Sequence, residues 1–438
     1  MRTAHLKPQL ASPSDDWHTW FGYYDTCPWS SDGSRLLAHR ARFCDRFPSA
    51  SDPCEIGFIE GWDSGAPRFV KLAESTAWNW QQGARLQWAM IDGQERVLFN
   101  DRRNGQPSCV ILNGDGSEHR VLDHPLYALS PDSCCALSID FARLTRLRPE
   151  YGLPGLVDPH SGDPAPKGSG IWSLDLITGE RRLIVDIASL DAHVAPGQSA
   201  PSGGDLHQHV NHLMFNPSGT RFCFMHRFQR ADGILHSRLF TSDIEGRDVS
   251  LLFEGLVSHY DWCDDSTILA WAGKRSLLGG ASVSGRSPVG MAMTLARRTL
   301  KPIYYALGKP RILMNKILKD SYLLIEDAEQ ARTEAFARGQ LMTDGHCTYG
   351  REGADPGRWV LADGYPDLKS RQPLFLWDTT SGSGVEIARL ETPRALDGDV
   401  RVDLHPRFSR DCRLVCVDSA KDGARRMYVF DVSSITAG

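Results

Sequence analysis

The C-terminal stretch DLHPRFSRDCRLVCVDSAKDGARRMYVF, residues 403–430, contains the pattern that decides the fold. A polar segment and a short apolar strand are followed by a turn of Ser, Pro, Asp or Gly, and then by a second, strongly β-prone strand. This second strand recurs seven times, as RLLAHR (35–40), RVLFNDR (96–102), CCALSID (134–140), RFCFMHR (221–227), TILAWAG (267–273), RWVLADG (358–364) and RLVCVDS (413–419). Repeated antiparallel meanders of roughly forty to sixty residues are typical of β-propeller blades. The sequence therefore predicts an all-β, seven-bladed β-propeller.

The seven units fill nearly all of the 438 residues, so we expect one domain over residues 1–438. The last unit runs out without a clear fourth strand, whereas the segment AHLKPQL at 4–10 belongs to no unit. Because closing the ring requires every strand edge to be paired, we expect residues 4–10 to supply the outer strand of the last blade. The alternative is a frayed N-terminal tail.

A basic segment, residues 274–320, interrupts the fifth unit between TILAWAG and the strand YLLIED at 322–327. It holds ten basic residues and one acidic residue, a net charge of +9 in a chain whose total is −5. Its apolar spacing is helix-like, with breaks at Pro302 and Pro310. Three interpretations stay open: a helical insertion packed on the rim of blade 5, a lid that attracts an anionic substrate, and a peripheral contact of residues 286–319 with an anionic membrane surface.

Composition and termini predict a cytoplasmic protein. No apolar run approaches the ~20 residues of a membrane span, and the start MRTAHLKPQLASPSDD lacks the apolar core of a secretion signal. The eleven cysteines include no CxxC pair, which argues against zinc fingers and a disulfide framework. Nucleic-acid binding is disfavoured because the basic residues concentrate in one insertion while the rest of the chain is acidic.

Polar side chains gather where the propeller topology predicts one mouth of the central channel. Residues just before the first strand and just after the second strand of each blade crowd around this mouth. Histidines hold the corresponding position in four units: His212, His259, His346 and His405. A lone histidine there more often caps a turn, and a lone arginine more often forms an ion pair between blades. Imidazoles aligned in four units beside guanidinium groups instead suit an anionic substrate, a metal ion or both.

The C-terminal third resembles the oligogalacturonate lyase family in DGH (344–346), LADGYPD (361–367), PLFLWD (373–378) and DLHPRFSRDCRLVCVDS (403–419). The resemblance implies a seven-bladed propeller that cleaves uronic-acid oligosaccharides by β-elimination. It also implies a manganese site, formed by the histidine of a GH motif and by a Q-x-x-H-x-H cluster. The GH histidine falls on His346 and the final histidine on His405, whereas the glutamine falls on Val400 and the first histidine of the pair on Asp403.

The metal-binding set implied by the resemblance is therefore His346, His405 and Asp403, a combination that suits Mn²⁺. A metal-free site, with Arg227 or Arg143 as the clamp for a carboxylate, is the alternative. In either case the carboxylate beside C5 must be neutralised before the C5 proton can leave.

The candidate residues for this chemistry follow from their place at the mouth. His212 and His259 are the candidate bases, Tyr24 and Tyr260 the candidate acids for the departing O4, and Arg227 the catalytic arginine. Residues expected to bind the acidic oligosaccharide or polysaccharide are Arg40, Arg102, Arg143, Gln82 and Asn211.

A second class of function stays open, namely a non-catalytic propeller that binds a glycan or a protein in polysaccharide biosynthesis. Single histidine substitutions should abolish turnover in a lyase and should matter little in such a binding protein. Glycoside hydrolysis is disfavoured because the sequence shows no pair of facing carboxylates.

Overall fold

The computed structural model describes residues 1–194, 200–201, 206–229, 235–274, 315, 319–353 and 355–437. In this part of the chain strands hold many more residues than helices do, which confirms the all-β prediction. The described helices are short: α1 (Phe141–Leu147), α2 (Ile187–Ala192), α5 (Ser433–Thr436) and the 3-10 turns η1 (Pro149–Tyr151) and η4 (Gly398–Val400). None of the helices in these ranges is long and apolar enough to cross a lipid bilayer.

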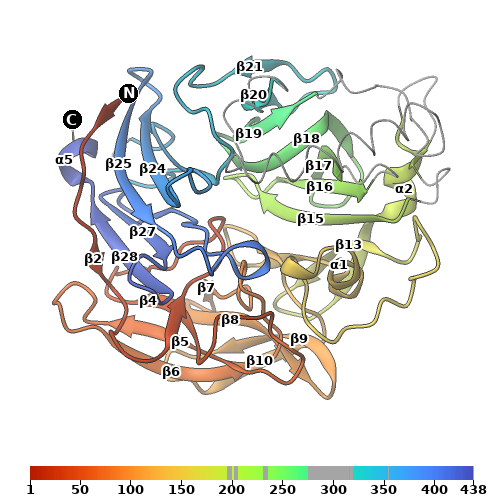
Figure 1. Cartoon of the computed structure of the whole chain (residues 1–438). Helices are drawn as coiled ribbons and strands as arrows, with labels where there is room; N and C mark the ends of the chain where they lie inside the picture. Colours follow the sequence, from red (N-terminus) through yellow and green to blue (C-terminus); the bar gives the residue numbers. More distant parts are fainter. Residues whose placement is uncertain are drawn as a thin grey trace.

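Hydrogen bonding groups the described strands into six sheets, which Figure 1 shows arranged around a common centre. The first three sheets are four-stranded antiparallel meanders. They contain β3 (His18–Trp20), β4 (Leu36–Ala41), β5 (Cys54–Glu60) and β6 (Arg68–Ser75); β7 (Gln87–Ile91), β8 (Gln94–Arg103), β9 (Gln106–Leu112) and β10 (Glu118–Leu122); and β11 (Ala128–Leu129), β12 (Cys135–Ile139), β13 (Gly170–Asp175) and β14 (Arg181–Asp186).

The fourth sheet has seven strands because one long strand belongs to two meanders. Its strands are β15 (Gln208–Phe215), β16 (Arg221–Gln229), β17 (Leu235–Asp243), β18 (Ser250–Trp262), β19 (Thr267–Gly273), β20 (Ser321–Glu326) and β21 (Thr333–Ala335). The first part of β18, up to Gly255, pairs with β17, and the part from Leu256 onward pairs with β19. One strand is thus the outer strand of one meander and the inner strand of the next.

The last two sheets each take a strand from the N-terminus. One contains β22 (Cys347–Tyr349), β23 (Trp359–Asp363), β24 (Arg371–Asp378), β25 (Ser383–Glu391) and β1 (Arg2–Thr3); the other contains β26 (Arg407–Phe408), β27 (Leu414–Ser419), β28 (Arg426–Asp431) and β2 (Gln9–Leu10). The antiparallel pairing of β2 with β28 confirms that the N-terminal segment supplies the outer strand of the last unit. The parallel pairing of β1 with β25 was not expected, because two exposed polar residues carry no strand pattern.

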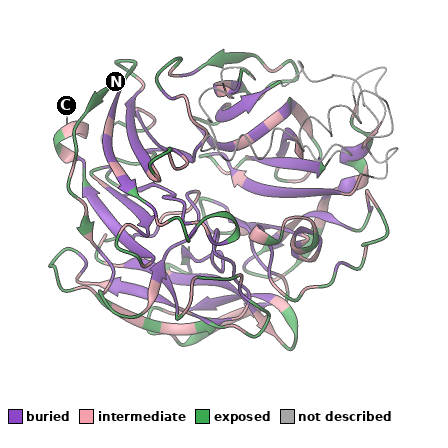
Figure 2. Ribbon diagram, viewed as in Figure 1, coloured by how far each residue is buried: buried purple, intermediate pink, exposed green. Residues whose placement is uncertain are grey.

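Burial falls from the centre of the molecule outward, as Figure 2 shows. Strand β4 is buried along its whole length, whereas the outer strand β6 of the same sheet is mostly partly or fully exposed. Tryptophans fill the space between sheets, and Trp20, Trp29, Trp78 and Trp262 are among the largest fully buried side chains.

The predicted helical insertion at 274–320 and the membrane contact at 286–319 lie almost entirely outside the described residues. The strands on either side of the insertion pair with each other, from Thr267 with Glu326 to Ala272 with Ser321. The segment between them therefore connects two neighbouring antiparallel strands of one sheet.

Candidate functional site

The four predicted histidines meet near the centre of the molecule. His212 and His259 lie within β15 and β18, and His346 and His405 lie just before β22 and β26. The ring centroids are 4.1 Å apart for His259 and His346, 4.2 Å for His346 and His405, and 6.4 Å for His212 and His259. All four side chains are buried.

Local irregularities of the backbone determine the direction in which the histidine rings point. The register of β15 shifts between Asn211 and Met214, and the register of β18 shifts between Val257 and Tyr260. Such bulges bend a strand and redirect its side chains, which places His212 and His259 at the centre. His212 and His405 also have left-handed φ values of 53° and 43°.

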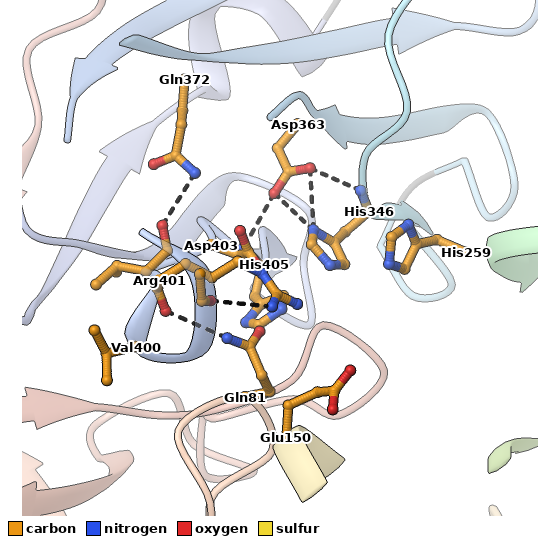
Figure 3. Close-up of polar contacts among 12 residues, drawn as sticks. Gln81, Glu150, His259, His346, Asp363, Gln372, Val400, Arg401, Asp403 and His405 are labelled. Carbon is orange, nitrogen blue, oxygen red and sulfur yellow. Dashed lines mark hydrogen bonds and ion pairs between the residues drawn. The ribbon is translucent and has the colours of Figure 1, made fainter. Parts of the chain in front are cut away.

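His346, Asp403 and His405 form a group that could hold one metal ion (Figure 3). One ligand atom from each residue lies within 4.8 Å of those of the other two. The Nε2 atoms of His346 and His405 are buried and have no hydrogen-bond partner among the described residues. Buried polar atoms normally have a partner, and imidazole with carboxylate is a donor set that suits Mn²⁺ or Zn²⁺. The three residues therefore fit a divalent metal ion.

Asp403 and His405 do not belong to a strand, because β26 begins only at Arg407. Asp403 and His405 instead belong to an irregular segment. Gln81 and Gln372 hold that segment by donating Nε2–H bonds to the carbonyl oxygens of Arg401 (3.3 Å) and Val402 (3.0 Å) (Figure 3).

Arg401 is the charged partner of Asp403. Its Nε donates to Oδ2 of Asp403 at 2.7 Å. Burial raises the pKa of Asp403, but the Arg401 guanidinium and the nearby His346 together outweigh burial and hold the pKa below its usual value. Asp403 is therefore a carboxylate at neutral pH. Val400, which falls on the glutamine of the family motif, packs in a hydrophobic cluster.

A cavity of about 1030 Å³ lies beside this group. Asp403 and His259 line it, whereas His346 and His405 are not among its lining residues. Its wall contains both arginines and acids, including Arg148, Glu150, Arg227, Asp344, Asp367, Arg394, Asp399 and Arg401. Several are paired, as Arg148 is with Glu150 at 2.6 Å. The mouth is thus mixed in charge.

His259 is paired with a carboxylate. Its Nδ1 lies 3.2 Å from Oδ1 of Asp344 and 3.1 Å from Oγ of Ser258. Burial, followed by the charge of His346, lowers the pKa of His259 in spite of Asp344. The ring is therefore neutral at neutral pH, and a proton on Nδ1 facing the carboxylate leaves Nε2 as the basic atom.

His212 also lines the cavity. Its Nε2 lies 3.4 Å from the hydroxyl of Tyr23, and the two rings stack with centroids 5.1 Å apart. Burial, assisted by the charge of Arg227, places the pKa of His212 well below the usual value.

The hydroxyl groups of the two predicted acids are engaged with the backbone. Tyr24 donates to the carbonyl oxygen of Tyr260 at 2.9 Å and accepts from the amide of the same residue at 3.1 Å. Tyr260 donates its hydroxyl proton to the carbonyl oxygen of His212. Burial raises the pKa of both phenols well above the usual value. We therefore do not retain Tyr24 or Tyr260 as proton donors.

Of the four predicted arginines, Arg227 lines the cavity, whereas Arg40, Arg102 and Arg143 are not among the lining residues. Arg143 donates to several carbonyl oxygens, among them that of Pro164 at 2.7 Å, and forms an ion pair with Asp158 at 3.5 Å. Arg40 forms an ion pair with Asp15 at 3.2 Å, and Arg102 donates to the carbonyl oxygen of Ala50 at 2.9 Å. These three arginines join segments of the fold to one another.

The two predicted amide side chains also lie away from the cavity wall. Gln82 donates to the hydroxyl of Tyr127 at 2.8 Å. Both polar atoms of the Asn211 side chain are buried without a hydrogen-bond partner in the described part of the chain.

Sequence reasoning missed Asp344, Arg401 and the turn Arg148–Tyr151, and it did not assign a role to Asp363. The sequence contained a signal for Asp344, because Asp344 and Asp403 each precede a site histidine by two residues, in D-G-H and D-L-H. The turn Arg148–Tyr151 carried no such signal, since it reaches the cavity from a distant part of the chain.

Comparison with known proteins agrees with this geometry at the level of the fold. No protein-family model and no curated protein matches the chain. An oligogalacturonate lyase from Vibrio parahaemolyticus is 14% identical, with a TM-score of 0.58 over 98% of this chain and 94% of the other. An oligogalacturonate lyase in complex with manganese is 13% identical, with a TM-score of 0.56 over 98% of each chain.

A puromycin-hydrolysing peptidase from Mycobacterium tuberculosis is also similar, with 13% identity and a TM-score of 0.48 over 99% of this chain and 56% of the other. The two lyase structures show that the chain has a β-propeller fold and a distant structural resemblance to oligogalacturonate lyases.

Proposed function

We propose that the chain is a seven-bladed β-propeller lyase that cleaves a uronic-acid oligosaccharide by β-elimination. The number of blades in the proposal is supported by counting β18 in both of the meanders that it joins. The observation that carries the proposal is the group formed by His346, Asp403 and His405 beside a large cavity, with two buried Nε2 atoms that have no hydrogen-bond partner among the residues that the structure describes. These residues would hold a divalent metal, Mn²⁺ in the proposal. Bound there, the ion supplies positive charge that neutralises the substrate carboxylate and favours loss of the C5 proton.

His259 is the proposed general base. Asp344 orients its ring through Nδ1, and the lowered pKa keeps Nε2 unprotonated at neutral pH. A base must be deprotonated at the working pH and within reach of the proton that it removes. His259 lines the cavity and packs against His346, so a sugar whose carboxylate faces the metal group would present C5 on this side.

His212 and Arg227 complete the proposed machinery. Both line the cavity, and Arg227 is fixed by donating Nε–H to Oγ of Ser237 (3.1 Å) and Nη2–H to the carbonyl oxygen of Val257 (2.7 Å). We propose that Arg227 binds a substrate carboxylate and that the N–H of His212 donates a hydrogen bond to the departing O4, which receives the proton that His259 has taken from C5.

The experiment is incubation of the purified protein with a panel of uronic-acid oligosaccharides while the ultraviolet absorbance of the new C4–C5 double bond is followed. A rise in absorbance with one member of the panel supports the lyase. Products without this absorbance, or binding without any product, would contradict it.

One observation favours a second candidate, a non-catalytic propeller that binds an acidic glycan or a protein. The hydroxyl groups of Tyr24 and Tyr260 are occupied by the backbone, and Asp403 is paired with Arg401. Fewer groups are thus available for proton transfer than the sequence predicted. Binding without turnover, retained after substitution of His259, would favour this candidate.

Contact of residues 286–319 with an anionic membrane is a further part of the proposal, and co-sedimentation with anionic vesicles tests it.

A further inference from the structure

Asp363, the last residue of β23, contacts both histidines of the proposed metal group. Its Oδ1 accepts from the backbone amide of His346 at 2.7 Å, and its carboxylate accepts from Nδ1 of the same residue at 3.0 and 3.1 Å. Its Oδ2 also accepts from the backbone amide of His405 at 3.2 Å. The side chain is buried, and Figure 3 shows it between the two histidine segments. One carboxylate therefore joins two sheets at the site.

Aspartates at the same place in two other repeats have a related structural role. In RVLFNDR, RWVLADG and RLVCVDS the sixth residue is Asp101, Asp363 or Asp418. Asp101 accepts from the amide of Thr76 at 3.1 Å, and Asp418 accepts from the amides of Phe21 and Gly22, each at 3.1 Å. All three carboxylates thus fix the backbone of another segment near the centre.

The side-chain partner distinguishes Asp363 from these two. Asp418 accepts from Nη2 of Arg407 at 2.7 Å, and Asp101 accepts from Nη1 of Arg103. Asp363 accepts from an imidazole, so the proton of the neutral ring lies on Nδ1 and Nε2 is left as a lone-pair donor. The Nε2 atom of His346 is buried and has no hydrogen-bond partner among the described residues.

Gly345 allows this contact, because a Cβ atom built at this position would lie 2.0 Å from the carbonyl oxygen of Asp363. A side chain at position 345 would push His346 away from Asp363. The D-G-H segment is therefore shaped for a close approach between the two residues.

We propose that Asp363 is a positioning residue that fixes the Nδ1–H tautomer of His346 and the backbone of His405, so that both Nε2 atoms face one ligand before it binds. The part of this inference that concerns a metal rests on the proposed function, whereas the tautomer does not depend on it. Outer carboxylates of this kind orient metal-binding histidines and raise their basicity, and their loss typically lowers metal affinity by about 10–100-fold.

The test uses the full chain with ¹⁵N-labelled histidine, at a pH where the ring of His346 is neutral. Long-range ¹H–¹⁵N spectra report the tautomer of His346, assigned with His346→Gln. Equilibrium dialysis against Mn²⁺ reports metal affinity. We expect Nδ1–H in the wild type, and in Asp363→Asn a shift toward Nε2–H with about 10–100-fold weaker Mn²⁺ binding. Asp101→Asn and Asp418→Asn are the matched controls, because each removes a carboxylate at the same repeat position, and neither should change the tautomer or the affinity.

An Nε2–H tautomer in the wild type would overturn the inference, and this result does not require any variant to fold. Unchanged tautomer and affinity in folded Asp363→Asn would overturn it as well. A wild type that has the Nδ1–H tautomer but binds no Mn²⁺ would support the positioning of His346 while contradicting the metal site of the proposed function.

Discussion

Nδ1 of His259 lies 3.2 Å from Oδ1 of Asp344, and the carboxylate leaves Nε2 as the basic atom of the ring. We predict that His259→Gln lowers the rate of elimination by about 10²–10⁴-fold, the usual contribution of a general base. Asp344→Asn should lower the rate less, because the base is present but less well oriented. Metal content should stay at the wild-type value in both variants, which elemental analysis checks.

His236→Gln is the matched control for His259→Gln. His236, on β17, also pairs with a carboxylate, Glu254 at 3.0 Å, but it is not among the residues that line the cavity. Its substitution should leave the rate unchanged. A full rate in His259→Gln would exclude this residue as the base.

The paired hydrogen bonds between Tyr24 and the backbone of Tyr260 predict a structural role for the Tyr24 hydroxyl. Tyr24→Phe leaves a buried amide and a buried carbonyl without their partner, which should lower the free energy of unfolding by about 1–3 kcal/mol. Urea unfolding measures this loss. The rate per folded molecule should be unaffected, and a collapse of the rate at unchanged stability would restore Tyr24 as the catalytic acid.

Closure of the last sheet depends on residues 9 and 10. Removal of residues 1–10 takes away β2 and exposes the edge of β28, so we expect a lower unfolding temperature and concentration-dependent aggregation. Removal of residues 1–4 takes away only β1, which adds two exposed residues to β25, and should have a small effect. Equal effects of the two truncations on thermal unfolding and light scattering would contradict this account of closure.

His39 predicts a loss of stability in acid. The ring is buried against Trp20 with centroids 5.2 Å apart, and Nε2 accepts from the amide of Ala84 at 2.9 Å. Burial lowers the pKa of His39 from 6.5 to about 3. Between these values the unfolded chain binds a proton that the folded chain excludes, so stability is full above the higher value and falls as the pH falls through this window.

Urea unfolding, measured at a series of pH values from about 7 to about 5, tests this dependence of stability on pH. His39→Gln removes the titrating group, and we expect a shallower slope than in the wild type, although the variant is less stable at neutral pH. A slope identical to that of the wild type would show that other groups cause the acid sensitivity.

Repetition explains how much of the fold could be predicted from the sequence. Seven copies of one strand pattern give the meanders and place His212, His259, His346 and His405 at one end of them. The pairing of β2 with β28 could be predicted because a closed ring leaves no strand edge unpaired. The continuity of β18 through two meanders was not predicted, because the local pattern of a strand does not show which neighbours it pairs with.

The site was less predictable because its polar contacts come from tertiary structure. Tyr24 and Tyr260 have the chemistry of acids, but their hydroxyl groups are used by backbone atoms distant in the sequence. Arg401 was missed because its partner Asp403 was assigned only as a metal ligand. The cavity wall at Arg148–Tyr151 comes from a turn that no repeat pattern marks.

The central claim, a lyase whose activity depends on a metal held by His346, Asp403 and His405, is tested most directly by measuring metal content and unsaturated product on one preparation. We predict that chelation removes both, that Mn²⁺ restores both, and that His405→Ala lowers both together. Full formation of the product by metal-free protein, with His405→Ala unimpaired, would contradict the claim.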